Sequence, residues 1–344
     1  MREFQINHNE AGQRFDKYLK KLLSNAPGSF VYKMLRKKNI TLNGKKADGT
    51  EKLVAGDSVK LFLADDTFEK FAGGNVASAE YQNLKELKST DRPEKKQSNQ
   101  NMVADQKLDV VYEDEDILVI NKPTGMLSQK AVPTDISANE YILHYLIEKG
   151  ELTEEMMRTF KPSICNRLDR NTSGLLIAGK TLKGLQEMAS ALKNRTVQKY
   201  YRCIVKGEVR KDAYIKGWLI KDEKTNKVTI YKEKPTGSQA EDAQAIETEY
   251  HPIAVAGGYS ELEVHLITGR SHQIRAHLSS IGHPIVGDTK YGNRQVNMRF
   301  SKELHVKSQL LHAYRMVFSN GKEIVADCGS EFAKVRTYLG LKKE

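Results

Sequence analysis

Residues 166–176 read Asn-Arg-Leu-Asp-Arg-Asn-Thr-Ser-Gly-Leu-Leu. Within this stretch, residues 171–174 are all of turn-forming types. The apolar run at 175–178, which Gly179 ends, has a length that suits a buried strand. We therefore expect Asp169, which precedes the turn, to lie on a rigid loop at the entrance of a strand, where functional residues often concentrate.

Asp169 stands between two cations, Arg167 and Arg170. Flanking positive charge favours the ionised form of a carboxylate and can also hold a polyanion above it. The alternative is an ordinary surface turn with an ion pair of little energetic weight. Other motifs of the sequence are needed to distinguish a functional carboxylate from a surface ion pair.

Around this loop, short strands and helices follow one another without regular alternation. Apolar residues indicate a strand at 117–120, alternating strands near 201–205 and 262–266, and an amphipathic helix at 182–192. Several strands follow one another like hairpins. This pattern predicts an α+β fold whose larger domain has a largely antiparallel, mixed sheet flanked by helices.

A second informative stretch begins at residue 268 and reads Thr-Gly-Arg-Ser-His-Gln-Ile-Arg. We expect Ser271 to cap a helix that runs to about residue 281, where Gly282 suits the stop. The expected buried stripe of this helix consists of Ile274, Leu278 and Ile281.

Arg270 and Arg275 lie near the beginning of this helix, where Asp or Glu would normally be preferred. Two arginines at that end suggest that a negatively charged group outside the helix requires them, although both can also be ordinary surface residues. Arg275 comes early enough to aim its permanently charged fork at a nearby carboxylate.

Four histidines near this helix raise the possibility of a metal site: His265, His272, His277 and His283. A spacing of five places His272 and His277 about 140° apart around a helix, not on one face. The chain has no H-E-x-x-H motif and no cysteine pair at zinc-ligand spacing. We therefore expect no metal.

A third element, Gln198-Lys199-Tyr200-Tyr201-Arg202, opens a strand. Tyr201 offers an aromatic face for stacking on a base, and a hydroxyl for hydrogen bonding or proton transfer. Taken alone, a tyrosine in a strand is more often part of a core.

The first 64 residues have the pattern of a small basic α+β domain. One helix carries apolar residues at 15–23, and a second begins near residue 29. Asn43-Gly44 is a strong hairpin signal. The basic end of the second helix and this turn predict a phosphate-binding surface made of Arg36, Lys37, Lys38 and Asn43. A merely solvated helix face is the alternative.

Residues 65–107 are poor in apolar side chains and rich in Gly, Ser, Asn, Gln and Lys, which predicts a flexible polar linker. Within it, Tyr81, Leu84 and Leu87 can form one helical turn against a neighbour. From residue 108 to 344 the chain again has a globular pattern, and we expect this part to form a second, larger domain.

Composition limits the functional classes further. Residues 1–62 contain 13 Lys and Arg against 6 Asp and Glu, in a chain with a formal net charge of +11. Such a concentration favours a nucleic-acid partner, although anionic membranes attract it too. No apolar run approaches 18 residues, and the beginning of the chain lacks the apolar region of a signal peptide. The three widely spaced cysteines fit a reducing compartment, so we expect a cytoplasmic location.

Together these motifs resemble the RluA-type RNA pseudouridine synthases, in particular the large-subunit rRNA enzymes with an N-terminal RNA-binding domain. The resemblance rests on residues 167–175, on Lys199 and Tyr201, and on the two groups 268–275 and 282–288. Residues 14–19, 43–44 and 56–57 resemble the small RNA-binding domain shared by a small-subunit ribosomal protein and tyrosyl-tRNA synthetase. One departure is Asn166, where the family usually has His.

The resemblance implies a pseudouridine synthase fold and an isomerase that uses no cofactor. Such enzymes cleave the N-glycosidic bond of a uridine, turn the base over and rejoin it through carbon. Asp169 would be the essential carboxylate, acting either as a nucleophile or by removing a sugar proton. Arg275 would pair with Asp169 and keep it charged, and Tyr201 would stack on the uracil and assist the final deprotonation.

The resemblance also implies RNA contacts. Arg167 would hold the RNA when the nucleotide leaves its stack, a base-flipping step that costs a few kcal/mol. Ile267 would help to form the apolar floor of the site, and Lys199, Arg170 and Arg270 would contact phosphates.

The implied substrate is a uridine in structured RNA, with 23S rRNA as the main expectation and tRNA left open. The expected partners exclude DNA and membranes, and a monomer is the default. A non-catalytic RNA-binding or ribosome-assembly factor is the alternative, but such a protein would need the arginines and not Asp169. A nuclease would require a histidine pair or a cluster of carboxylates.

Overall fold

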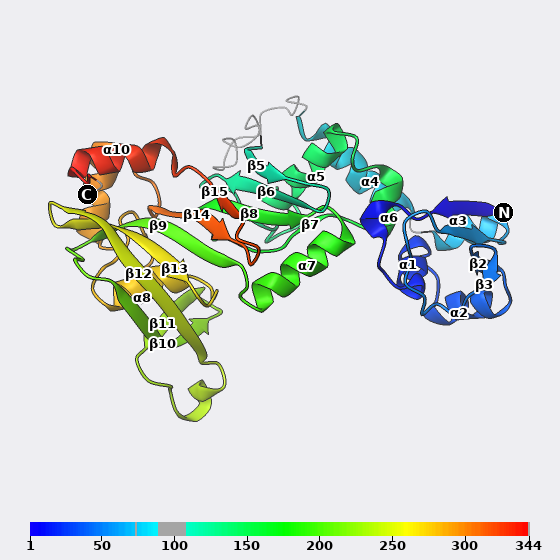
Figure 1. Cartoon of the computed structure of the whole chain (residues 1–344), viewed down its shortest axis with the longest axis horizontal. Coiled ribbons are helices and arrows are strands. Elements are labelled where there is room, and N and C mark those ends of the chain that lie inside the picture. Colours follow the sequence, from blue (N-terminus) through cyan, green and yellow to red (C-terminus); the bar gives the residue numbers. More distant parts are fainter. Residues whose placement is uncertain (73, 89–107, 343–344) are drawn as a thin grey trace. The chain divides into compact units, whose positions relative to one another are not determined.

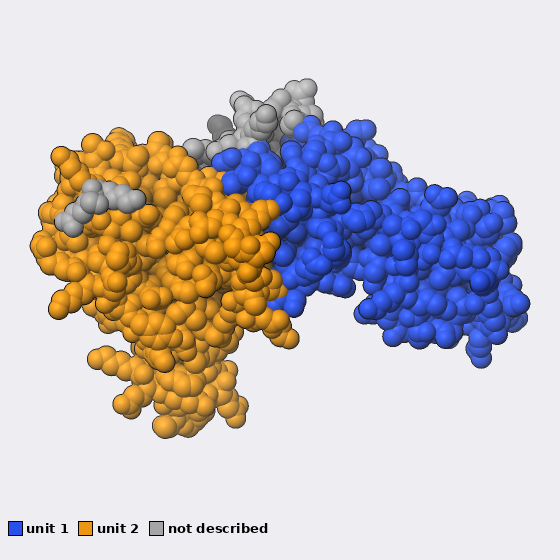
Figure 2. All heavy atoms as spheres, viewed as in Figure 1, with its two compact units in different colours: residues 1–119, 129–166, 177–190 blue, residues 120–128, 167–176, 191–344 orange. Residues whose placement is uncertain are grey.

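The computed structural model describes residues 1–72, 74–88 and 108–342. The chain forms two compact units, which Figure 2 distinguishes by colour. Unit 1 consists of residues 1–119, 129–166 and 177–190, and unit 2 of residues 120–128, 167–176 and 191–344. This division does not follow the predicted boundary at residue 108, because unit 1 includes segments from both sides of it.

The N-terminal part of unit 1 is a small sheet with two helices (Figure 1). Its strand order is β1-β4-β2-β3, and all neighbours are antiparallel. The side chains at 15, 18, 19 and 22 form the buried face of its first helix, as their spacing predicts. The elements are β1 (Arg2–Gln5), η1 (His8–Glu10), α1 (Phe15–Leu22), α2 (Gly28–Arg36), β2 (Ile40–Leu42), β3 (Lys45–Lys46) and β4 (Ser58–Leu61).

The predicted hairpin at Asn43-Gly44 is confirmed. Asn43 has φ +49° and Gly44 has φ +72°, so both central residues take the left-handed conformation that suits a two-residue hairpin turn. The Asn43 amide also braces the turn, since its Nδ2 donates to Asp57 and its Oδ1 accepts the N–H of Ser58, each at 2.8 Å. Asn43 therefore has a structural role that the sequence prediction of an RNA contact did not include.

The prediction of a flexible linker is wrong for residues 65–88. Two helices, α3 (Asp65–Phe71) and α4 (Gly74–Lys85), and the short η2 (Glu86–Lys88) occupy this segment. Phe68 enters the N-terminal core, and Leu84 is buried with its carbonyl 2.8 Å from Nδ1 of His144. A few well-spaced apolar side chains are thus enough to anchor a segment of polar composition. The rest of the predicted linker, 89–107, lies outside the described residues.

The remainder of unit 1 consists of short strands and three helices. Strands β6 and β8 contribute residues to both units. Their apolar runs at 117–120 and 175–178 are buried, as predicted for strands inside a layered fold. The elements are β5 (Val110–Glu113), β6 (Ile117–Lys122), α5 (Ala138–Glu148), α6 (Glu154–Thr159), β7 (Ser163–Ile164), β8 (Ser173–Gly179) and α7 (Leu182–Lys193).

Unit 2 contains long antiparallel strands in the order β11-β10-β12-β13-β9-β14, with β15 also paired to β14. Strand β8 joins β14 in parallel, which makes the sheet mixed. The predicted α+β class with a largely antiparallel sheet is confirmed. The strands are β9 (Gln198–Lys206), β10 (Ala213–Asp222), β11 (Lys227–Tyr231), β12 (Gln244–Ala256), β13 (Tyr259–Leu266), β14 (Leu311–Val317) and β15 (Glu323–Val325).

Three helices accompany this sheet: α8 (Gln273–Ser280), α9 (Arg294–Leu304) and α10 (Gly329–Leu339), with a 3-10 turn η3 at Gly237–Ala240. Helix α8 differs from its prediction in two respects. Its N-cap is His272 and not Ser271, and Ile281 is 37% exposed instead of buried. No described helix is long and apolar enough to cross a membrane.

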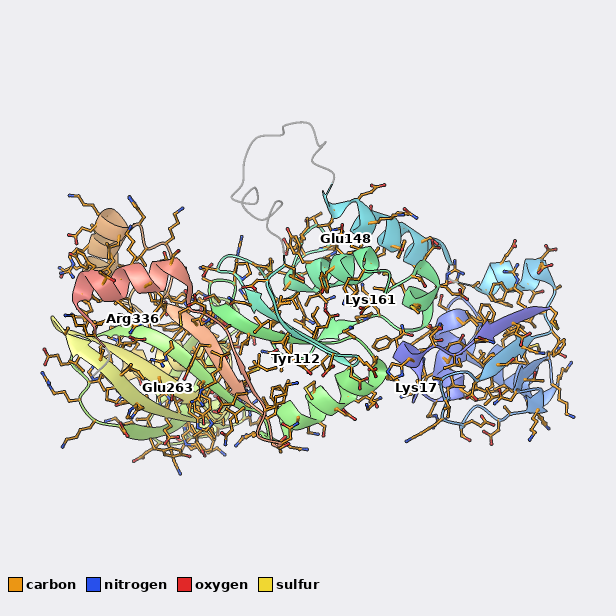
Figure 3. The ribbon with its side chains drawn as sticks, turned by 45° about the horizontal axis from the view of Figure 1, so that its top comes forward. Lys17, Tyr112, Glu148, Lys161, Glu263 and Arg336 are labelled. Carbon is orange, nitrogen blue, oxygen red and sulfur yellow. The ribbon has the colours of Figure 1, made fainter. Side chains whose placement is uncertain are left out.

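Polar side chains link strands on the face of the sheet that carries Arg202. Arg315 reaches Glu263 at 3.3 Å, while the buried Glu261 lies between Arg202 at 3.3 Å and Arg336 of α10 at 2.8 Å. Figure 3 shows Glu263 on β13 and Arg336 on α10. The pair of Arg336 and Glu261 holds α10 against the sheet, and the face of β9 that carries Tyr201 is the opposite one.

Candidate active site

Asp169 and its hydrogen-bond partner Arg275 belong to unit 2. The Asp169 turn is closed by a backbone bond from Thr172 N–H to the Asp169 carbonyl, 3.0 Å long. On the preceding side, the Ser128 hydroxyl both donates to the Leu168 carbonyl at 2.9 Å and accepts the Leu168 N–H at 3.0 Å. Asp169 is therefore fixed from both sides, as expected for a rigid loop.

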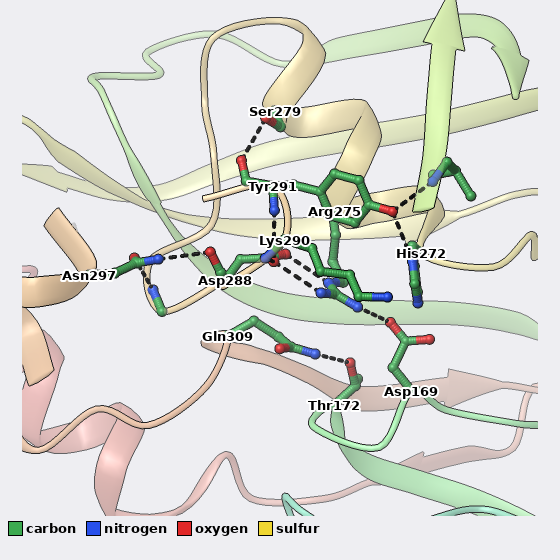
Figure 4. Close-up of polar contacts among 12 residues, drawn as sticks. Asp169, Thr172, His272, Arg275, Ser279, Asp288, Lys290, Tyr291, Asn297 and Gln309 are labelled. Carbon is green, nitrogen blue, oxygen red and sulfur yellow. Dashed lines mark hydrogen bonds and ion pairs between the residues drawn. The ribbon is translucent and has the colours of Figure 1, made fainter. Parts of the chain in front are cut away.

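Gly174 lets this loop enter the sheet. Its φ is +113°, and a Cβ there would lie only 2.2 Å from the backbone oxygen of Ala313 on β14. Gln309, shortly before β14, donates to the Thr172 hydroxyl at 3.3 Å (Figure 4). The loop is thus packed against the backbone of β14 without room for a side chain.

Lys122 lies under the loop and is fully buried. Its Nζ donates to the carbonyls of Pro123 and Met126 at 2.9 Å and of Arg170 at 3.2 Å. Burial lowers the pKa of Lys122 to about 7, and the negative charge of Asp169 opposes this shift. One side chain therefore ties the end of β6 to the residue that follows Asp169.

Arg275 connects two carboxylates (Figure 4). Its Nη1 donates to Oδ2 of Asp169 at 2.7 Å, whereas its Nε and Nη2 donate to both oxygens of Asp288 at 2.7 and 3.0 Å. The Arg275 side chain is 6% exposed, Asp288 is completely buried, and Asp169 keeps 26% of its side chain accessible. Asp169 is therefore the carboxylate of this group that a substrate can reach.

Asp288 is stabilised as an anion. Its Oδ1 also accepts the backbone N–H groups of Lys290 at 2.8 Å and Tyr291 at 3.1 Å. Burial acts to raise the pKa of Asp288, but the hydrogen bonds and charge of Arg275 together with these N–H groups outweigh it and hold that pKa below its usual value. Burial likewise acts to lower the pKa of Arg275, and its two carboxylate partners raise that pKa above its usual value.

Tyr201 lies on β9, paired with Val264 on one side and with Ala313 on the other. It is 6% exposed. Burial raises the pKa of Tyr201 above its usual value, and the charge of Asp169 adds to the effect. Tyr201 is thus a neutral phenol within electrostatic reach of Asp169.

Comparison with known proteins identifies this arrangement. The family model described as RNA pseudouridylate synthase matches residues 116–280. A protein of Mycoplasma genitalium named as an uncharacterized RNA pseudouridine synthase is 30% identical over 320 residues, which cover 92% of this chain and 88% of that protein. The chain belongs to the RNA pseudouridine synthase family.

Two further similarities agree with this assignment. The ribosomal large subunit pseudouridine synthase C of Vibrio vulnificus is 29% identical to the synthase over 336 residues, 96% of this chain and 94% of that protein. The solved structure of human RNA pseudouridylate synthase domain containing 4 superposes with a TM-score of 0.58 at 19% identity, covering 68% of this chain and 94% of that one. That structure supports the pseudouridine synthase fold. The synthase is an enzyme that isomerises uridine to pseudouridine in RNA.

The predicted RNA-contacting cations occupy different positions on the synthase. Arg167, Arg170 and Arg270 are exposed, and Arg170 also donates from Nε to the Gly125 carbonyl at 3.1 Å. Lys199 is half-buried above Gly269, and burial lowers its pKa. Ile267 follows β13 and is half-buried.

The other predicted RNA contacts belong to unit 1. Arg36, Lys37 and Lys38 are exposed at the end of α2, as the sequence suggests, and Asn43 is exposed at the hairpin. These four residues belong to unit 1, whereas Asp169 belongs to unit 2.

Asn166, the departure from the family pattern, has a clear local role. Its Oδ1 accepts the backbone N–H of Ile177 at 2.8 Å, while the N–H of Cys165 donates to the Ile177 carbonyl at 2.7 Å. An amide oxygen therefore fastens the start of the Asp169 loop to β8. This contact needs a hydrogen-bond acceptor and no titratable ring.

The histidines near α8 do not form one cluster. His265 pairs with Glu249 and stacks on Tyr200, while Nδ1 of His277 lies 3.0 Å from the Thr248 hydroxyl. Among the residues that the structure describes, no group of three or more His, Cys, Asp or Glu side chains could hold a metal ion.

Sequence reasoning missed four residues of the site, namely Lys122, His272, Asp288 and Tyr291. Only two of them had even a weak signal in the sequence: Lys122 ends an apolar strand, and Asp288 directly follows a glycine. Since each acts through a neighbour distant in sequence, only the folded chain shows what it contacts.

Proposed function

We propose that the synthase modifies uridines of large-subunit ribosomal RNA, with Asp169 as the essential carboxylate. The observation that carries the proposal is the 2.7 Å contact from Arg275 to Asp169, the accessible member of an otherwise buried charge group. The name of the Vibrio vulnificus relative, ribosomal large subunit pseudouridine synthase C, supports rRNA as the substrate.

Asp169 can begin the reaction in two ways. Its free oxygen can attack the uridine as a nucleophile, or it can remove a proton from the ribose. Both routes require an ionised and oriented carboxylate. Arg275 supplies the orientation, because its remaining nitrogens are locked onto the buried Asp288.

Tyr201 supplies a ring for the base to stack on. Because its pKa is raised, its hydroxyl acts as a hydrogen-bond donor or acceptor and not as a phenolate. The exposed Arg167 next to the loop holds the RNA when the target nucleotide leaves its stack, and Lys199, Arg170 and Arg270 contact phosphates.

Residues 1–64 act as an RNA-binding domain, and residues 108–344 as the catalytic domain. The exposed cations at the end of α2 provide sequence-independent attraction for the RNA backbone. Target choice then follows RNA shape and the combined placement of both surfaces. We expect a monomer that works in the cytoplasm.

The test is to map pseudouridine in the rRNA of cells that lack this chain. We expect one or more uridines of 23S rRNA to lose the modification, and the wild-type chain to restore it. Loss at tRNA sites with rRNA unchanged would refute the rRNA assignment. An unchanged map in all RNA would refute the activity in cells.

A further inference from the structure

His272 stands next to the site with a backbone conformation that an L-residue rarely adopts. Its φ is +54° and its ψ is +15°, a left-handed conformation that costs about 1–2 kcal/mol for a non-glycine residue. The following Gln273 fixes this turn, since its side chain bonds Thr268, the Arg270 N–H and the Glu247 carbonyl. Gly or Asn would adopt this conformation more easily, so the imidazole is present despite a local cost.

Tyr291 holds the imidazole ring from one side. The Tyr291 hydroxyl lies 2.9 Å from His272 Nδ1, and the two rings meet edge to face with centroids 5.7 Å apart. The same hydroxyl accepts the backbone N–H of Val228 on β11 at 2.9 Å. The Arg275 guanidinium lies 5.3 Å from the centre of the Tyr291 ring, which adds a further restraint.

We assign the tautomer of the imidazole from these contacts. The Tyr291 oxygen already accepts one N–H, and its single proton is satisfied by donation to Nδ1 of His272. The ring proton of His272 is then on Nε2. Burial lowers the pKa of His272, with the charge of Asp169 in opposition, so the ring is neutral near pH 7 and Nε2–H is a single, directed donor.

Nε2 has no hydrogen-bond partner among the residues that the structure describes. Figure 4 shows the ring of His272 extending from Tyr291 toward the side of the site where Asp169 and the Lys290 side chain converge. The charge of Asp169 acts on the pKa of His272, so the two side chains belong to one electrostatic environment. A uridine that reacts with Asp169 would lie beside the imidazole.

We propose that His272 reads the target base, donating a hydrogen bond from Nε2–H to a carbonyl oxygen of uracil, O2 or O4. This rests on the proposed role of Asp169, which places the nucleoside beside the imidazole. A neutral donor suits a carbonyl, whereas phosphates are better served by the exposed arginines. Flipped bases are read by hydrogen bonds to their edges.

The two carbonyls have different consequences for specificity. A donor aimed at O4 rejects cytidine, because the cytosine amino group would face Nε2–H and leave two donors opposed. A donor aimed at O2 would not separate the two pyrimidines. The experiment must therefore distinguish the oxygens.

The test uses the full-length protein and an rRNA fragment whose single target residue is uridine, 2-thiouridine or 4-thiouridine. Sulfur is a weaker hydrogen-bond acceptor than oxygen, so the thio substitution at the contacted position weakens the proposed bond. We expect one of the two thio substrates to lower kcat/KM of the wild type by about 10-fold. In His272→Ala, we expect turnover of uridine to fall about 10-fold and this thio substrate to cause no further loss.

His272→Asn is the matched control for the backbone, because Asn tolerates the left-handed conformation but its amide is too short to replace Nε2. We expect His272→Asn to show the same loss of uridine turnover and the same insensitivity to the thio substrate. It therefore provides the test even if His272→Ala does not fold. If both thio substrates slow the wild type and the Asn variant by equal factors, His272 contacts neither carbonyl and the inference is wrong. A wild type that converts no uridine at all would instead contradict the proposed function.

Discussion

Arg275 holds Asp169 with one nitrogen, Nη1 at 2.7 Å, and leaves the second oxygen of that carboxylate free of the guanidinium. The other two donors of its fork are committed to Asp288. Since Asp288 is completely buried, the guanidinium cannot rotate without breaking a paired, desolvated contact. The orientation of Asp169 thus depends on a residue that the substrate does not touch.

Arg275→Lys keeps one positive charge but loses the planar fork. A lysine can satisfy one of the two carboxylates at a time, so we expect kcat to fall about 100-fold, with a much smaller change in RNA affinity. Single-turnover kinetics and a binding titration measure the two quantities. Equal losses in kcat and affinity would show that Arg275 binds RNA instead of orienting Asp169.

Asp288→Asn should lower stability more than its small change in volume suggests. Removing one partner of a buried ion pair costs about 3–5 kcal/mol, measured here by urea unfolding at pH 7. Glu223→Gln is the control. The Glu223 side chain is 78% exposed, so this substitution should change the free energy of unfolding little.

The difference in stability between wild type and Asp288→Asn should depend on pH. Because the folded state holds the pKa of Asp288 below its usual 3.8, the stability that Asp288 contributes is present above that value and is lost as the pH falls through the lowered pKa. The gap between wild type and Asp288→Asn should therefore be full at pH 7 and shrink below about pH 4. A gap that stays constant down to pH 3 would contradict this account of the ion pair.

Lys122→Met should loosen the Asp169 loop. Three carbonyls lose their donor, and an unsatisfied buried polar group costs about 1–3 kcal/mol. Because the folded pKa of Lys122 is about 7 and the unfolded one near 10.5, folding releases a proton between these values, and wild-type stability gains from this group as pH rises. The difference in the free energy of unfolding between wild type and Lys122→Met should thus widen from pH 7 to pH 10. A difference that narrows would contradict the lowered pKa of Lys122.

The sequence predicted the parts of the fold that depend on local pattern. The helix at 182–193, the Asn43-Gly44 hairpin and the buried strand after Asp169 were readable, because their periodicity and turn residues act over a few positions. The helix α3 was missed, since a polar composition hid the buried Phe68, and of α4 the sequence indicated only one turn, that of Tyr81, Leu84 and Leu87.

The site was predictable only in part. Asp169 and Arg275 stand in recognisable motifs, and the structure brings them together. The contacts that join Asp288 to Arg275, His272 to Tyr291 and Lys122 to the Arg170 carbonyl span 13, 19 and 48 residues of the chain. His272 also depends on a left-handed backbone. No local rule specifies such contacts.

The basic surface of the N-terminal domain can be tested without deleting that domain. A deletion would remove Lys21, whose Nζ donates to the Thr159 carbonyl at 2.8 Å, and would disturb unit 1. The substitutions Arg36→Gln, Lys37→Gln and Lys38→Gln together should weaken RNA binding and reduce the slope of log affinity against log salt by about 2–3. Turnover at saturating RNA should be unchanged. Lys302→Gln, at an exposed lysine of α9, is the control. An unaltered salt slope would show that this surface does not contact RNA.

The most direct measurement compares wild type with Asp169→Asn in single-turnover formation of pseudouridine on an rRNA substrate. Asparagine keeps the size of the side chain and an oxygen for Arg275, so the variant should fold. Its RNA affinity should stay within about threefold of wild type. We expect no detectable pseudouridine from the variant under conditions where the wild type converts its target completely. Turnover by Asp169→Asn within about tenfold of wild type would contradict the central claim that this carboxylate performs the reaction.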